Sequence, residues 1–191
     1  MKRIGYGQVE PNHLSAQKTG QIYAQLPAHI SDGKEGSAPT ISQLENGQFV
    51  KYDYANGEVN FTGSGEWMLV FNEVKLYDGW RETYKDFAMI DSNYTEGSDT
   101  ITHYGIGPLK GQMVPRVFKT NIGDIYTTNC LEKAGARGVE TQMTDVTVGQ
   151  KLKINDNGFL AANGTSDMQF EVVKVYTLPD GQEAVKVMRI K

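Results

Sequence analysis

Four acidic side chains lie in the most aromatic and apolar stretch of the chain, and they are the first candidates for chemistry. The stretch is EWMLVFNEVKLYDGWRETYKDFAMI, residues 66–90, and the acids are Glu73, Asp78, Glu82 and Asp86. Carboxylates at close spacing can act as the acid and the base of a hydrolytic reaction. The alternative is a structural role, in which two strands and a turn carry these charges on a solvated face.

A second stretch with the same pattern favours the structural role. Residues 47–90 begin GQFVKYDYANGEVNF, and residues 149–190 begin GQKLKINDNGFLAAN. Both stretches then cross a loop that contains glycine, run through a long apolar segment and turn at Asp-Gly. Asn-Gly and Asp-Gly flanked by strand-like residues are typical of hairpins. We therefore expect residues 66–77 and 80–90 to form a long hairpin whose mixed charges pair across the strands.

The other reactive residue types are scattered along the chain. His13, His29 and His103 form no His-x-His pair and have no cysteine cluster near them, although a transition metal needs several converging ligands. Cys130 is the only cysteine, so no disulfide can form within the chain, and a reducing compartment is expected. No phosphate-binding loop motif occurs. The sequence therefore predicts no catalytic residues, no metal site, no cofactor and no enzymatic activity.

Composition narrows the range of partners. The chain has 191 residues and a net charge of −4, and it contains no long block of Lys and Arg, which argues against nucleic acid as a partner. The longest strongly apolar run, WMLVF, is too short to span a bilayer, so no membrane partner is expected. The start, MKRIGYGQVEPNH, has no apolar run after its positive charges, which predicts no secretory signal.

The predicted fold is all-β, with two similar small antiparallel β-units (each a barrel or a sandwich) and an extended N-terminal arm. From residue 46 onward, short runs rich in Val, Phe, Tyr and Thr alternate with turn pairs such as NG and DG. The predicted division is an arm over residues 1–45, a first β-unit with connecting strands over 46–120, and a second β-unit over 121–191. The pattern leaves open whether the two units share one core.

Isolated apolar residues stand out in the predicted arm, which is otherwise rich in Gly, Pro, Gln, Ser and Ala. Two interpretations remain open: a loose terminus, or an arm whose apolar groups dock on a neighbouring subunit. The second interpretation predicts partner contacts at Tyr6, Leu14, Ile22, Tyr23 and Leu26.

Three stretches carry a resemblance to a known class of proteins. They are GEWMLVFNEVKLYDGWRETYKDFAM, VPRVFKTNIGDIYTTN, and VGQKLKINDNGFL with LPDGQEAVKVMRI. Over most of residues 45–191 the chain resembles small β-rich capsid-associated or head-decoration proteins of tailed bacteriophages. The resemblance implies a non-enzymatic virion protein that is assembled in the host cytoplasm and stabilises the capsid through contacts between subunits. Its partners would be the major capsid protein or copies of itself, in an oligomeric arrangement.

A second hypothesis comes from the aromatic content of ten Tyr and two Trp residues. Flat aromatic rings can stack on sugar rings, and Trp67 and Trp80 are the candidate platforms. On this hypothesis the chain is a carbohydrate-binding or cell-wall-binding β-module of a phage tail or fibre.

Overall fold

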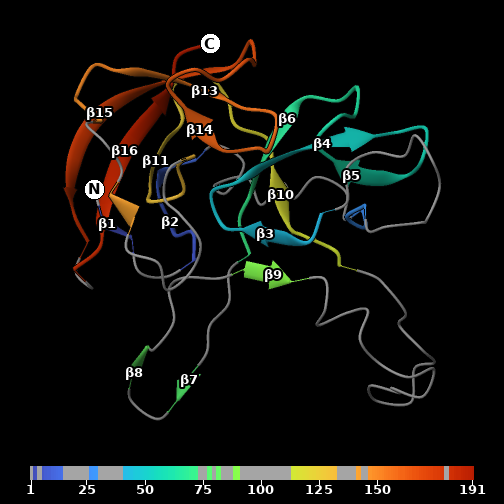
Figure 1. Ribbon diagram of the computed structural model, residues 1–191, viewed down its shortest axis with the longest axis horizontal. Coiled ribbons are helices and arrows are strands. Elements are labelled where there is room, and N and C mark those ends of the chain that lie inside the picture. The colour runs from blue at the N-terminus through green and yellow to red at the C-terminus, as the bar shows by residue number, and fades with distance from the viewer. Residues whose placement is uncertain are drawn as a thin grey trace.

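The computed structural model shows that the protein is all-β, as predicted from the sequence. It describes residues 2–3, 6–14, 26–29, 41–72, 77–78, 81–82, 88–90, 113–132, 141–142, 146–178 and 181–191. Within these ranges there are sixteen strands and no helix, and two larger antiparallel sheets contain most of the strand residues (Figure 1). No helix that could span a membrane occurs among the described residues.

The larger sheet has six strands and comes mainly from the C-terminal part of the chain. Its order is β14 (Leu160–Ala161), β13 (Lys151–Ile154), β15 (Gln169–Thr177), β16 (Glu183–Arg189), β11 (Ile125–Thr128) and β2 (Val9–His13). The longest ladder joins β15 to β16 as a hairpin, with Thr177 opposite Glu183. This hairpin is the one that the second repeat predicts.

The smaller sheet has four strands in the order β10 (Val117–Phe118), β6 (Trp67–Val70), β4 (Phe49–Asp53) and β5 (Glu58–Asn60). Three short ladders complete the described strands. They pair β3 (Gln43–Glu45) with β9 (Ala88–Ile90), β7 (Tyr77–Asp78) with β8 (Arg81–Glu82), and β1 (Lys2–Arg3) with β12 (Thr141–Gln142). The β7–β8 pair lies apart from both larger sheets, at the bottom of Figure 1.

The first three strands of the two predicted repeats pair in the same way. In the smaller sheet β4 lies between β5 and β6, and in the larger sheet β13 lies between β14 and β15. The entry to each unit is also the same, because the Gly47 amide donates to the Val70 carbonyl at 2.9 Å and the Gly149 amide donates to the Val172 carbonyl at 2.7 Å. The repeated sequence pattern therefore corresponds to a repeated arrangement of three strands.

The predicted long hairpin of residues 66–77 and 80–90 is wrong in its pairing. Strand β6 lies between β4 and β10, and β9 pairs with β3. Among the described residues, the two segments pair with each other only at the tip of the hairpin, where Tyr77 lies opposite Glu82 and Asp78 lies opposite Arg81. The edge of β6 that the hairpin would have used is occupied by β10.

Two asparagines divert the chain after β6. The Asn72 amide donates to Asn46 Oδ1 at 2.8 Å, and Asn46 Nδ2 donates to the Asn72 carbonyl at 3.1 Å. Asn72 Oδ1 accepts from the Arg116 amide at 2.9 Å, which brings the segment before β10 alongside. Residues 73–76 and 83–87 lie outside the described residues, as do the side chains of Asp78 and Glu82, so the predicted charge pairing of the four carboxylates stays a prediction.

The two larger sheets share one hydrophobic core. Phe49 and Leu69 are fully buried and directly opposite each other on β4 and β6. The Phe49 ring lies 5.4 Å from the ring of Phe170 on β15, and all three residues belong to one buried cluster. The corresponding pair of the second unit is Lys151 opposite Glu171, neither of which is buried. At corresponding positions the first unit has an apolar pair and the second unit has a charged pair, and the apolar pair is buried against the other unit.

A tight turn reinforces this junction. The turn between β13 and β14 places Gly158 against the start of β4, where the Phe49 amide donates to the Gly158 carbonyl at 2.7 Å. The side chain of Gln48 donates to the Asn157 carbonyl at 2.8 Å. Together with the shared cluster, these bonds make the two sheets one sandwich-like body. The division into units at residues 46–120 and 121–191 stays a prediction of sequence pattern.

Replacing Tyr126 by Phe is expected to stabilise the protein by about 1 kcal/mol. Tyr126 is fully buried in the shared core, and its hydroxyl oxygen has no hydrogen-bond partner among the described residues. Burial raises the pKa of this hydroxyl well above its ordinary value, and the neighbouring Cys130 adds to the shift. Removing the hydroxyl removes the cost of burying it unpaired, and urea unfolding measures the gain.

Tyr176→Phe is the matched control, because the Tyr176 hydroxyl donates to Thr127 Oγ1 at 2.6 Å. This variant is expected to lose stability, by roughly 1 kcal/mol. If the two variants shift the urea midpoint in the same direction, the account of the buried Tyr126 hydroxyl is wrong.

Candidate functional site

Two described segments of the predicted N-terminal arm lie along edges of the two larger sheets. Strand β2 pairs with β11 at one end of the six-stranded sheet. Residue Ala28 forms a parallel bridge with Val59 of β5, at one end of the four-stranded sheet. Backbone bonds secure this bridge, from the Val59 amide to the Pro27 carbonyl at 2.8 Å and from the His29 amide to the Val59 carbonyl at 2.9 Å. Segments of the arm therefore add strands to their own chain.

The five predicted partner contacts lie in different surroundings. Leu14 is 2% exposed and belongs to the shared core of this chain. Leu26 is half-buried and packs against a second buried cluster, on the other face of the four-stranded sheet. Tyr6 is half-buried, and Ile22 and Tyr23 lie outside the described residues. The partner role of these residues stays a prediction, and Leu14 already has neighbours within its own chain.

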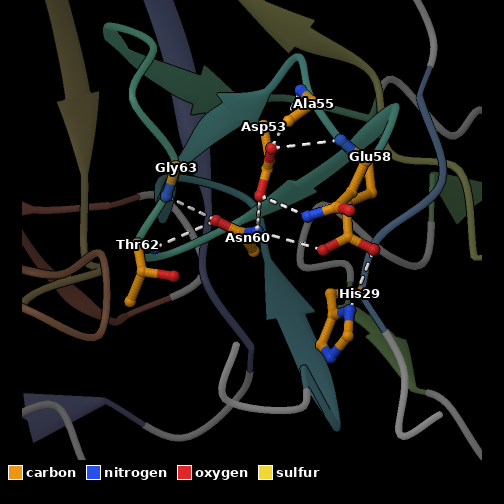
Figure 2. Close-up of polar contacts among 8 residues, drawn as sticks. His29, Asp53, Ala55, Glu58, Asn60, Thr62 and Gly63 are labelled. Carbon is orange, nitrogen blue, oxygen red and sulfur yellow. Dashed lines mark hydrogen bonds and ion pairs between the residues drawn. The ribbon is translucent and has the colours of Figure 1, made fainter. Parts of the chain in front are cut away.

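A buried polar cluster lies beside the edge formed by residues 26–29 (Figure 2). Asn60 is fully buried at the end of β5. Its Nδ2 donates to Asp53 Oδ2 at 3.2 Å and to Glu58 Oε1 at 3.1 Å. Its Oδ1 accepts from the amides of Thr62 and Gly63 at 3.0 and 2.6 Å. Because one amide side chain satisfies groups on β4, on β5 and in the following loop, it fixes their relative positions.

His29 connects this cluster to the arm. His29 Nδ1 lies 2.8 Å from Glu58 Oε2, and the two side chains are 7% and 17% exposed. An imidazole beside a carboxylate is an arrangement that enzymes use in general-base catalysis. Here, however, His29 Nε2, the nitrogen that would face a substrate, is buried and has no hydrogen-bond partner in the part of the chain that the structure describes. The geometry fits a clamp that holds residues 26–29 on β5. No sequence motif pointed to this pair, because the partners are far apart in the chain.

Asp53 makes the cluster sensitive to acid. The side-chain amide of Asn56 is the main cause of a lowered pKa for Asp53, and the Asn56 backbone amide and the side chain of Asn60 add to it. A lowered pKa in the folded state means that the charged carboxylate stabilises the fold above its unfolded pKa of about 3.9. That contribution is lost as the pH falls through the lower folded value.

Asp53→Asn is therefore expected to be less stable than the wild type at pH 7, by an amount that shrinks below about pH 4. The physical reason is that the variant has no carboxylate to protonate. Urea midpoints of both proteins across the acid range measure the difference. A difference that stays constant from neutral pH to about pH 2.5 would contradict the assigned role of Asp53.

A cleft of about 560 Å³ lies between residues of the two larger sheets and their loops. It is lined by residues of β4 and β6, the β5–β6 loop, the β13–β14 turn, the β14–β15 loop and the C-terminal end. Trp67, one of the two predicted stacking platforms, lines this cleft together with Phe61. The other platform, Trp80, lies outside the described residues.

Ion pairs and hydrogen bonds hold the polar lining of the cleft in place. Glu66 Oε1 lies 3.0 Å from Arg189 Nη1, and Glu66 Oε2 lies 2.9 Å from Lys119 Nζ. On the opposite wall Thr165 Oγ1 donates to Asp156 Oδ1 at 2.8 Å. The Lys51 ammonium lies 4.8 Å from the centre of the Trp67 ring. The cleft therefore combines aromatic surface with charged groups of both signs.

A scan against models of protein families finds no match, and searches of curated proteins and of solved structures find none either. Among the described residues, no three His, Cys, Asp or Glu side chains converge in a way that could hold a metal ion. Arguments about function therefore start from the sequence resemblance and from the geometry of the sheet edges and the cleft.

Proposed function

We propose that this chain is a non-enzymatic structural protein of a tailed-phage particle, an auxiliary or decoration protein that stabilises the capsid through contacts between subunits. The observation that carries the proposal is the docking of N-terminal segments on edges of both larger sheets, β2 as an edge strand and Ala28 through an isolated bridge. Strand addition uses main-chain hydrogen bonds, which can join strands of two chains as well as strands of one chain. A protein built this way has a general means of attaching to its neighbours.

The rigid body behind these edges supports the same role. The two sheets share a close-packed core and a hydrogen-bonded turn, which hold them together as one body. A partner that binds only the assembled shell stabilises it by mass action, and many copies per particle multiply that effect. The slightly acidic net charge of −4 fits a position away from packaged DNA.

The test is whether the chain is part of the particle. Particles produced by the phage whose genome encodes this chain are purified on a density gradient and measured by quantitative mass spectrometry. The proposal predicts the chain at a fixed ratio to the major capsid protein, and a portal or major capsid gene beside its own gene. Purified particles that lack the chain would refute the proposal.

The two partner residues outside the described ranges allow a sharper test of the arm. Deleting residues 1–30 would remove β2 together with the buried Val9, Leu14 and Ala28, so it would disturb the fold as well as any docking. The double variant Ile22→Ser with Tyr23→Ser is expected to reduce particle occupancy at least tenfold, with thermal unfolding within about 2 °C of wild type. Full occupancy of the particle by this variant would contradict the partner role of the arm.

A further inference from the structure

We propose that the cleft between the two larger sheets is a binding site for a neutral carbohydrate. Two loops of equivalent position form opposite parts of its lining. The β5–β6 loop contributes Phe61, Gly65 and Glu66, and the β14–β15 loop contributes Thr165 to Met168. Each loop follows the second strand of its predicted repeat, so the cleft lies between corresponding elements of the two repeats.

The charges of the lining select against ionic ligands. Three basic and three acidic side chains face the cleft, namely Lys51, Arg189 and Lys191 with Glu66, Asp156 and Asp167. An anionic ligand would meet the carboxylates, and a cationic ligand would meet the ammonium and guanidinium groups. A neutral ligand that offers both donors and acceptors can use both sets. A sugar, whose every hydroxyl both donates and accepts, has this property.

The aromatic lining supplies the second element of sugar recognition. The C–H face of a sugar ring is apolar, and it packs on flat aromatic side chains while the hydroxyls at its edge reach polar groups. Trp67 and Phe61 provide aromatic surface in the same cleft as Asp156 and Thr165. The volume of about 560 Å³ lies within the range of roughly 300–1,000 Å³ that is usual for small-ligand sites.

Lys51 connects the aromatic surface of the cleft with its hydrogen-bonding groups. Its ammonium lies over one face of the Trp67 ring, 4.8 Å from the ring centre. A cation–aromatic contact at an accessible site is weak enough for a ligand to displace. A sugar that takes the place of the ammonium on the ring would leave the three N–H donors of Lys51 beside its hydroxyls. Lys51 therefore acts as a movable donor at the edge of the aromatic surface.

The purified full-length chain tests this inference without any phage particle, so its outcome is separate from that of the proposed function. The chain is applied to an array of oligosaccharides in three groups: neutral (glucose, mannose and N-acetylglucosamine oligomers), anionic (sialylated and sulfated) and cationic (glucosamine oligomers). Binding to neutral members, with a change in tryptophan fluorescence that persists in Trp80→Phe, is the expected result. Binding confined to a charged group, or no binding to any group, would overturn the inference.

Variants assign the binding to the cleft. Asp156→Ala and Thr165→Val change exposed side chains. Each is expected to raise the dissociation constant for the bound neutral sugar at least fivefold. Lys51→Ala is expected to raise this dissociation constant at least threefold. Lys174→Ala is the matched control, because the Lys174 ammonium lies 5.1 Å from the centre of the Tyr176 ring, and neither residue lines the cleft. If Lys174→Ala weakens binding while the cleft variants leave it unchanged, the site lies elsewhere and the inference fails.

Discussion

Gly158→Ala is expected to destabilise the protein by about 3 kcal/mol. Gly158 has a φ of +79°, a conformation that costs a residue with a side chain about 1–2 kcal/mol. A Cβ at this position would also lie 2.0 Å from the Phe49 carbonyl oxygen, so the turn must move away from β4. The movement weakens the hydrogen bond from the Phe49 amide to the Gly158 carbonyl, at a further cost of roughly 1 kcal/mol.

Gly57→Ala is the matched control, since Gly57 ends the corresponding turn of the first unit. Its φ is +67°, but a Cβ there would meet nothing within 4 Å. Only the conformational cost applies, so a loss of about 1 kcal/mol is expected. Equilibrium urea unfolding measures both variants. Equal losses would show that the turn of Gly158 contributes no contact between the sheets.

Phe49→Ala is expected to cost about 3–5 kcal/mol, the usual range for a fully buried phenylalanine. The Phe49 side chain is 0% exposed, and its ring contacts the ring of Phe170 in the other sheet. The truncation leaves a cavity between the two sheets that neither sheet can close alone. Because the loss falls on the shared core, both sheets are expected to unfold at a lower urea concentration.

The corresponding position of the second unit provides the control. Lys151 occupies on β13 the place that Phe49 occupies on β4, and its side chain is exposed. Lys151→Ala is therefore expected to change stability by no more than about 0.5 kcal/mol. A loss for Phe49→Ala as small as that for Lys151→Ala would mean that the apolar pair on the first unit does not join the sheets.

Local features of the sequence predicted the strands and turns well. Asn-Gly and Asp-Gly pairs marked the turns after β4, β13 and β15, because these residues tolerate the backbone angles that tight turns need. The β-branched residues between them gave strands, and the first three strands of the two predicted units pair in the same order. Turns and strands of this kind depend on residues that are adjacent in the sequence, so a local sequence pattern is enough to predict them.

Strand partners set by distant residues were not predictable in the same way. The first repeat carries the same Asp-Gly signal as the second, yet β6 pairs with β10 and not with the segment after the turn. The bonds of Asn72 with Asn46 and Arg116 decide the outcome, and they join residues far apart in sequence. Likewise, the sequence does not show whether an apolar arm residue such as Leu14 is buried in the core of its own chain or against a neighbouring subunit.

The candidate sites were also predictable only where they depend on local sequence. Trp67 was predictable as a candidate because its large flat aromatic ring is visible in the sequence, and the structure places it in the cleft. The opposite wall, with Asp156 and Thr165, comes from the other repeat and is brought close only by the packing of the sheets. The pairing of His29 with Glu58 also depends on the arm lying along β5, which no local pattern indicates.

Scanning calorimetry of the full-length chain tests the central claim most directly, namely that the two repeated units form one rigid body. The account predicts a single endotherm whose calorimetric and van't Hoff enthalpies agree, because a shared core unfolds as one cooperative unit. It also predicts that Gly158→Ala lowers the temperature of this one transition without splitting it. Two separate endotherms in the wild-type protein, one for each sheet, would contradict the account.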